Sequence, residues 1–184
     1  MNIVLLGGAF NPPHNGHLMV AQQVLDFTDA DEVWFLPNYG QVPVKSVATV
    51  EDRLAMTKLL RLPKTCVSTI EINNKLDGET VHLLPFLPKE HTFSFIIGSD
   101  QLSGFTAWLD WEKLLASMRF WVFPRPGCPA EPLYENMSVL NHNSLISSDI
   151  SSTKIRERVK QGLPIDQFVP KEISAYIQEH ALYQ

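Results

Sequence analysis

The chain has 184 residues and a mass of 20.8 kDa, a length typical of one domain with at most a small appendage. Apolar residues make up 45% of it and charged residues 19%, values that exclude disordered and fibrous proteins. The net charge of −5 and a pI near 5.6 argue against a nucleic-acid-binding protein, although a local basic cluster can still bind a small anion.

The sequence also bears on the compartment of the protein. Cys66 and Cys128 fit no zinc pattern and are expected to be reduced thiols, as in a cytosolic chain. No apolar run is long enough to cross a membrane, and residues 1–8 lack the basic start of a secretory signal. We therefore expect a cytoplasmic protein that binds neither nucleic acid nor membranes. The sequence leaves homo-oligomer formation open.

Short apolar runs alternate along the chain with segments whose apolar residues follow helical spacing. The predicted strands cover residues 2–6, 32–37, 65–72, 92–97 and 119–123, with a weaker one over 138–146. The predicted helices cover residues 17–27, 49–61, 108–116 and 152–161, with a last helix that begins at Pro170. Residues 73–88 are expected to form a turn at Asp77 and Gly78 and then a short helix interrupted by Pro85. Four prolines predict a loop over 124–132.

This alternation predicts an α/β fold, a Rossmann-like and mostly parallel sheet with helices on both faces. We expect one domain over residues 1–184, with the Rossmann-like core in 1–140 and a small helical part in 141–184. In such a sheet, ligands bind outside the carboxyl ends of the strands, near the point where the strand order reverses. That rule directs attention to residues 7–17, 37–45 and 98–108 and to the helix start near 152.

The segment between the first strand and the first helix, residues 7–17, reads Gly-Gly-Ala-Phe-Asn-Pro-Pro-His-Asn-Gly-His. It is neither a dinucleotide fingerprint nor a Walker loop. Its adjacent glycines allow close backbone approach, and its imidazoles, His14 and His17, stand near a helix N-terminus. Such groups can bind phosphate oxygens and stabilise the charge of a phosphoryl-transfer transition state. A purely structural role stays open, as does a metal site, although no nearby cysteine or acidic pair completes a ligand set.

A second candidate, residues 150–156, reads Ile-Ser-Ser-Thr-Lys-Ile-Arg and begins a predicted helix. Residues 151–153 are N-cap types. Lys154 and Arg156 then place cations at the positive end of the helix dipole, where a bound anion would compensate them. The alternative is that both side chains extend into water.

A third candidate follows the predicted strand 92–97. Gly98 allows close backbone approach, and Asp100 could accept hydrogen bonds from a ribose. Trp108 or Trp111 could stack on a flat ring. From spacing alone, two core tryptophans with a loop aspartate are the favoured interpretation.

Together these segments resemble the nucleotidylyltransferase superfamily with its H-x-G-H and I-S-S-T-x-x-R signatures. Within it, the chain looks most like the bacterial nicotinate-nucleotide adenylyltransferases of NAD biosynthesis. The resemblance extends over most of the chain in order, through residues 34–38, 53–56, 96–102 with Trp108, and 169–183.

The resemblance implies adenylyl transfer from ATP to nicotinate mononucleotide, with in-line attack of the mononucleotide phosphate and release of deamido-NAD and pyrophosphate. It implies no covalent intermediate, and Mg²⁺ carried mainly by the ATP phosphates. The implied catalytic residues are His14, His17 and Arg156. The implied ATP-binding residues are Gly8, Ala9, Phe10, His14, His17, Lys45, Gly98, Asp100, Ile150, Ser151, Ser152, Thr153 and Arg156. The implied acceptor-binding residues are Thr80, Asp100 and Trp108.

The chain departs from this family pattern in the acceptor region. Residues 43–45 read Pro-Val-Lys where Pro-His-Lys is usual, residues 78–80 read Gly-Glu-Thr in place of Ser-Tyr-Thr, and His82 replaces a common aspartate. If Glu79 faces the acceptor pocket, it repels the carboxylate of nicotinate. Nicotinamide mononucleotide or another phosphate ester is therefore the alternative acceptor. A non-catalytic nucleotide-binding domain is the other alternative, against which the intact motif residues argue.

Overall fold

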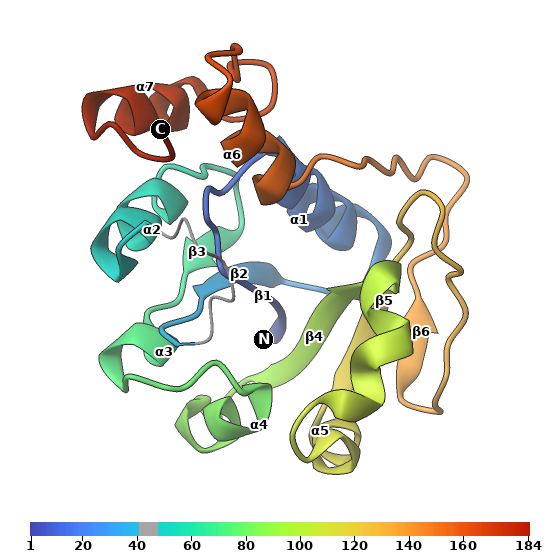
Figure 1. The fold of residues 1–184 in the computed structure, drawn as a ribbon. Coiled ribbons are helices and arrows are strands. Elements are labelled where there is room, and N and C mark those ends of the chain that lie inside the picture. The colour runs from blue at the N-terminus through green and yellow to red at the C-terminus, as the bar shows by residue number, and fades with distance from the viewer. Residues whose placement is uncertain (41–47) are drawn as a thin grey trace.

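Six strands form one sheet in the computed structural model, which describes residues 1–40 and 48–184 (Figure 1). The sheet has the order β3-β2-β1-β4-β5-β6, and every pairing between these neighbours is parallel. The strands are β1 (Asn2–Gly8), β2 (Glu32–Pro37), β3 (Thr65–Val67), β4 (Thr92–Gly98), β5 (Arg119–Phe123) and β6 (Met137–Val139). The strand order reverses between β1 and β4, and the predicted parallel α/β fold is confirmed.

Helices cover both faces of this sheet, as predicted. They are α1 (Asn15–Phe27), α2 (Val50–Thr57), α3 (Ile70–Asn73), α4 (Thr80–Leu83), α5 (Trp111–Ser117), α6 (Ser152–Lys160) and α7 (Lys171–Glu179), with 3₁₀ segments η1 (Leu84–Phe86) and η2 (Ser99–Ala107). In Figure 1, α1, α2, α6 and α7 lie on one side of the sheet and α4 and α5 on the other. Among the described residues, no helix is long and apolar enough to cross a membrane.

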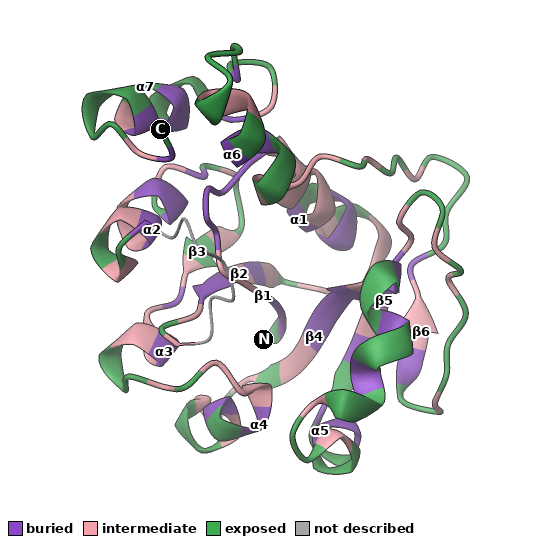
Figure 2. Ribbon diagram, viewed as in Figure 1, coloured by how far each residue is buried: buried purple, intermediate pink, exposed green. Residues whose placement is uncertain are grey.

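Strand β1 divides the hydrophobic core into two clusters because successive side chains point to opposite faces. Val4 and Leu6 pack with buried residues of α1, α2, α6 and α7. Ile3 and Leu5 pack with buried residues of α4, η2 and α5. The purple segments in Figure 2 follow this division, with burial on the central strands and on the inner sides of the helices. Each fully buried aliphatic side chain contributes about 1.5–3 kcal/mol.

Two predicted strands are shorter in the structure, and a proline explains each difference. The prediction of a strand over 65–72 is wrong beyond Val67, because Ser68 donates to Phe35 O and the next ladder bond would need an N–H from Pro37. The prediction over 138–146 is wrong beyond β6 for the same reason. Leu140 donates to Val122 O, and the partner strand then continues into Pro124.

The predicted helix over 108–116 also differs. A 3₁₀ segment, η2, precedes Trp108, and α5 begins only at Trp111. Asp110 lies between them with a φ of +49°, a left-handed conformation that no α-helix continues through. Trp108 therefore stands on extended backbone between two helical segments, free to project its ring toward the ends of the strands.

A buried polar cluster fixes the first loop to the C-terminal segment. Asn11 Oδ1 accepts hydrogen bonds from Ala48 N at 3.0 Å and from the Tyr183 hydroxyl at 2.8 Å. The backbone oxygen of Asn11 accepts from Arg156 Nη1 at 2.8 Å. Burial raises the pKa of Tyr183, which keeps its hydroxyl protonated and able to donate. The loop that leads to His14 and to His17 in the first turn of α1 thus depends on residues that lie far away in the sequence.

Replacing Tyr183 by Phe removes the hydroxyl that donates to Asn11 and leaves the ring in place. We expect the free energy of unfolding to fall by about 1–2 kcal/mol, because a buried acceptor loses a hydrogen bond. Urea unfolding measures this change. Tyr176→Phe is the matched control, since that hydroxyl donates to Asp52 Oδ1 at 2.9 Å in a partly exposed place where water can replace it. An equal loss in both variants would contradict the importance given to the Asn11 contact.

Candidate active site

Two cavities meet at the carboxyl ends of β1 and β4, where the strand order reverses. Both are lined by Gly7, Gly8, Ile96 and Gln101. The larger, about 350 Å³, also contains Trp108 and is called the tryptophan cavity below. The other, about 280 Å³, is called the histidine cavity. This is the place where ligands bind in doubly wound sheets.

The structure gathers the predicted site residues unequally around these cavities. The histidine cavity brings together Gly8, His14, His17, Gly98, Asp100, Ser151 and Ser152. The tryptophan cavity brings together Gly8, Thr80 and Trp108. Neither cavity is lined by the other predicted residues, which are Ala9, Phe10, Ile150, Thr153 and Arg156. Lys45 lies outside the described residues. Asp100, which was predicted to contact both ATP and the acceptor, lines the histidine cavity but not the tryptophan cavity.

The imidazoles of His14 and His17 stack on each other with ring centroids 3.8 Å apart. His17 Nδ1 accepts a hydrogen bond from the backbone N–H of His14 at 3.0 Å, so the neutral ring carries its proton on Nε2. Gly16 makes room for this arrangement, because a Cβ there would lie 2.9 Å from His14 Nδ1. The H-x-G-H spacing thus leaves one imidazole N–H of His17 available to a ligand.

Both histidines are uncharged at neutral pH. Burial holds the pKa of His14 well below its usual value and lowers the pKa of His17 to about 4, and the charge of Arg125 lowers both further. His14 Nδ1 is buried and has no hydrogen-bond partner among the described residues. The pair therefore offers the cavity hydrogen-bonding groups rather than positive charge.

The start of α6 is joined directly to the first loop. The Ser152 hydroxyl donates to Pro12 O at 2.8 Å, and Ser151 caps the helix by accepting from Lys154 N at 3.3 Å. These contacts bring the two sequence motifs to one cavity, although more than a hundred residues separate them. Ser151 and Ser152, at the start of this helix, line the same cavity as the histidines, and the first backbone N–H groups of a helix have no partner within the helix.

The cations of that helix already have partners within the chain. Lys154 forms an ion pair with the exposed Asp149. Arg156 is buried and donates to Asn11 O at 2.8 Å and to Thr153 Oγ1 at 3.1 Å. The alternative that both side chains extend into water is therefore wrong for Arg156, which is buried, and holds for Lys154, which is exposed. A bound anion at this helix start stays a prediction. Arg156 lies behind the first loop and supports it.

Arg125 is a functional candidate that the sequence interpretation missed. It lines the histidine cavity, and its Nε lies 3.4 Å from Asp100 Oδ1. The signal was available, because Arg125 follows β5 within the loop at the carboxyl end of a strand that borders β4. Among the described residues that line this cavity, Arg125 is the only lysine or arginine.

Arg53 is a second missed residue, with only 1% of its surface exposed. Its Nη1 donates to Ala9 O and to Asn38 O, each at 2.8 Å, and its Nη2 donates to Tyr39 O at 3.4 Å. Arg53 therefore holds together the loops that follow β1 and β2. The sequence marked residues 53–56 as part of the resemblance but gave no sign of this structural role.

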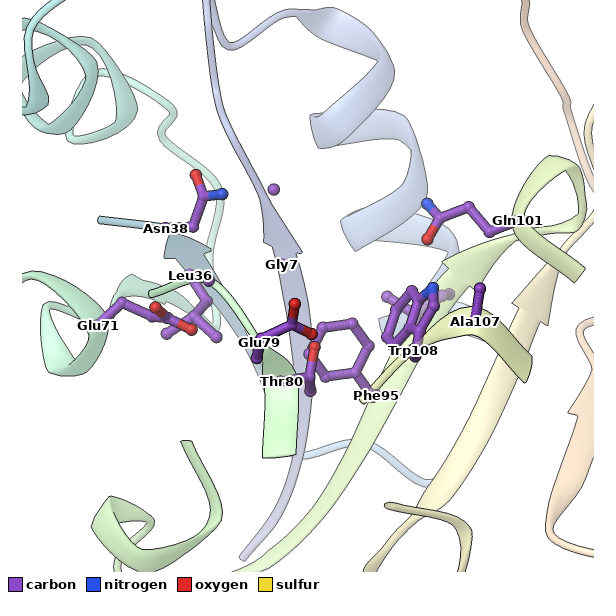
Figure 3. Close-up of a pocket in the computed structure, with 13 residues that line it drawn as sticks. Gly7, Leu36, Asn38, Glu71, Glu79, Thr80, Phe95, Gln101, Ala107 and Trp108 are labelled. Carbon is purple, nitrogen blue, oxygen red and sulfur yellow. The ribbon is translucent and has the colours of Figure 1, made fainter. Parts of the chain in front are cut away.

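The tryptophan cavity combines an aromatic wall with two carboxyl groups. Trp108 packs edge-on against Phe95, with ring centroids 6.2 Å apart. Figure 3 shows the Trp108 ring on one side of the cavity, Thr80 next to Glu79 across from it, and the side chains of Glu79 and Glu71 directed inward from that other side. Glu79 therefore faces this cavity, which is the condition under which its charge would repel the carboxylate of nicotinate.

Acidification is expected to destabilise the protein through its histidines. A histidine with a lowered pKa binds fewer protons folded than unfolded, so stability is lost as the pH falls from about 6.5 toward 4. Between pH 6.5 and 4.5 the wild type should lose about 1–3 kcal/mol more than His17→Gln. Thermal melting of both proteins across this pH range measures the difference in stability. Because the pKa of Glu71 is raised, Glu71 stabilises the protein as the pH falls, but this contribution is common to both proteins and cancels in the difference. Parallel pH profiles would contradict a neutral, buried His17.

Residues 5–158 match the family model described as cytidylyltransferase-like. A protein of Halalkalibacterium halodurans described as a probable nicotinate-nucleotide adenylyltransferase is 38% identical over 99% of this chain and 91% of its own length. A protein of Bacillus licheniformis with the same description is 35% identical over 99% and 98%. The structure of Plasmodium falciparum nicotinic acid mononucleotide adenylyltransferase complexed with NaAD superposes with a TM-score of 0.80 at 21% identity, covering 99% of this chain and 97% of that one. The resemblance is confirmed, and the chain belongs to the cytidylyltransferase-like family and, within it, to the nicotinate-nucleotide adenylyltransferases.

Proposed function

We propose that the chain transfers the adenylyl group of ATP to nicotinate mononucleotide and releases deamido-NAD and pyrophosphate. The observation that carries this proposal is the meeting of two unlike cavities at the backbone of Gly7 and Gly8. One offers groups suited to phosphate oxygens, and the other offers an aromatic wall suited to a pyridine ring. Family membership and the names of the relatives support the choice of substrates.

In this proposal the ATP phosphates lie in the histidine cavity. The Nε2–H of His17 and the first-turn N–H groups at Ser151 and Ser152 would donate to phosphate oxygens. Because these donors are held in place before substrate arrives, they stabilise the charge that develops at the α-phosphate without reorganising. Lys45 stays a predicted phosphate contact. The adenosine would lie along Gly98 and Asp100.

Arg156 takes a supporting part in this scheme. Its guanidinium holds the Asn11 carbonyl, and so positions against α6 the loop that leads to His14 and to His17 in the first turn of α1. Ala9 and Phe10 belong to the same loop, where Phe10 packs against the His17 ring with centroids 4.7 Å apart. These residues set the geometry of the donors, and we assign the nearest cationic contact to Arg125.

Mg²⁺ would enter with the triphosphate and neutralise part of its charge. Within residues 1–40 and 48–184, no three His, Cys, Asp or Glu side chains are grouped closely enough to hold a metal. Among the described residues that line the histidine cavity, Asp100 alone has a carboxylate, and it lies beside Arg125. This donor set fits a cation that keeps its waters and is carried mainly by phosphates.

The acceptor would stack its ring on Trp108 and direct its phosphate toward the histidine cavity through the shared glycines. Attack by that phosphate on the α-phosphorus then needs no covalent intermediate with the protein. We further propose a cytoplasmic location, which the two unbridged cysteines support. The direct test is pyrophosphate release from ATP with a panel of pyridine mononucleotides, and absence of release with every acceptor would refute the proposal.

His17→Ala is expected to lower kcat by roughly 10²–10³, the range for losing one donor that stabilises charge in the transition state. The Kd for ATP should change much less, because this contact strengthens as the transition state forms. Steady-state kinetics and ATP titration of the same preparations measure both values. His142→Ala is the control, since this exposed ring stacks on Phe27 away from the cavities. A wild-type turnover in folded His17→Ala would remove His17 from the mechanism.

A further inference from the structure

The tryptophan cavity is acidic. Its described lining contains two glutamates, Glu71 and Glu79, and no lysine, arginine or histidine. Nicotinate brings a third carboxylate into this space if its ring stacks on Trp108. Like charges at close range oppose each other strongly where water is scarce. Acceptance of nicotinate therefore requires that at least part of this negative charge be absent when the substrate binds.

Glu71 is the group that can lose its charge. Only 3% of its surface is exposed, and its Oε2 is buried without a hydrogen-bond partner among the described residues. Its other carboxyl interaction is with the backbone N–H of Tyr39. An ionised oxygen left unpaired in such a place is costly, whereas a protonated carboxyl is tolerated. Figure 3 shows this side chain extending from α3 to a place beside Leu36, on the side of the cavity opposite Trp108.

The neighbouring charges favour the same conclusion. Burial raises the pKa of Glu71 to about 7, and the negative charge of Asp77 raises it further against the opposing effects of the Tyr39 N–H and His82. Asp77 and His82 are themselves paired at 3.0 Å, so their charges partly cancel at Glu71. Glu79 faces the same cavity and would add to the repulsion. Glu71 is thus able to change its charge near neutral pH.

We propose that Glu71 is a specificity-determining residue of the tryptophan cavity, where its carboxyl discriminates between a carboxylate and a carboxamide on the pyridine ring through its own state of charge. The protonated form admits nicotinate mononucleotide. The ionised form opposes that substrate and admits nicotinamide mononucleotide, whose amide carries no charge. This inference rests on the proposed function and adds to it a second acceptor, used increasingly as the pH rises.

The sign of the linkage follows from proton balance. A bound carboxylate favours protonated Glu71. Glu71 therefore takes up a proton when nicotinate mononucleotide binds near pH 7, and it does not when the carboxamide binds. The phosphate of each acceptor also titrates near this range, but it is common to both molecules. The ratio of kcat/KM for the two acceptors removes that shared contribution, together with every change at the ATP side.

The experiment measures this ratio, nicotinate over nicotinamide mononucleotide, from pH 6 to pH 8.5. In wild type we expect it to fall by roughly tenfold as Glu71 ionises. Glu71→Gln keeps the size of the side chain without its charge, and its ratio should stay constant within about twofold near the wild-type value at pH 6. Glu90→Gln, which removes the charge of an exposed glutamate outside both cavities, should behave as wild type.

A wild-type ratio that does not change with pH would overturn the proposal, as would a fall of equal size in Glu71→Gln. Calorimetry in two buffers of different ionisation enthalpy decides the matter even if Glu71→Gln does not fold. Proton uptake is expected to be larger on binding nicotinate mononucleotide than on binding nicotinamide mononucleotide, because the phosphate contributes equally to both, and equal uptake contradicts the role of Glu71. Absence of turnover with both acceptors would instead refute the proposed function, so the two failures are distinguishable.

Discussion

The position of the first loop depends on one buried residue, Asn11. Its backbone oxygen is held by Arg156 and its side-chain oxygen by Ala48 and Tyr183, so three later segments converge on a single residue. A polar group buried this deeply is costly unless it is paired, and these bonds satisfy it. Because the two histidines follow three and six residues later, any shift at Asn11 would move the imidazoles that line the histidine cavity. The C-terminal helices are therefore part of the site even though they contribute few residues to its surface.

The sequence predicted the architecture well and the interior less well. The strand and helix alternation, the two motif segments and the family were all legible, because periodicity and local turn chemistry reflect short-range constraints. The wrong predictions concern segments whose conformation is determined by contact with a residue far away in the sequence. The alternation around Glu71 suggested a strand, but β3 stops where Pro37 offers no N–H, and the chain turns into α3 with Glu71 inside. Nothing local shows that a glutamate will be buried there.

The roles of the arginines were the hardest to predict for the same reason. Arg156 at a helix start suggested a bound anion, yet its partner is a carbonyl 145 residues earlier in the chain. Arg53 was part of a recognised segment, but its burial among the carbonyls of two loops is visible only in three dimensions. Arg125 alone carried a readable signal, a cation at the carboxyl end of a strand beside the switch point. Sequence motifs thus locate the site, whereas packing decides which cations face the ligand.

The two cavities differ in charge, and this difference gives the site a direction. The histidine cavity has neutral imidazoles, helix N–H groups and Arg125, all suited to anionic phosphates. The tryptophan cavity has two carboxyls and an aromatic face, which suit the positively charged ring nitrogen of a pyridine mononucleotide. A substrate with a cationic ring at one end and a phosphate at the other is therefore favoured in one orientation only. In the proposed function, that orientation would bring the phosphate to the shared glycines, facing the α-phosphorus of ATP, and it would leave the substituent on the ring as the feature that the carboxyls must still accommodate.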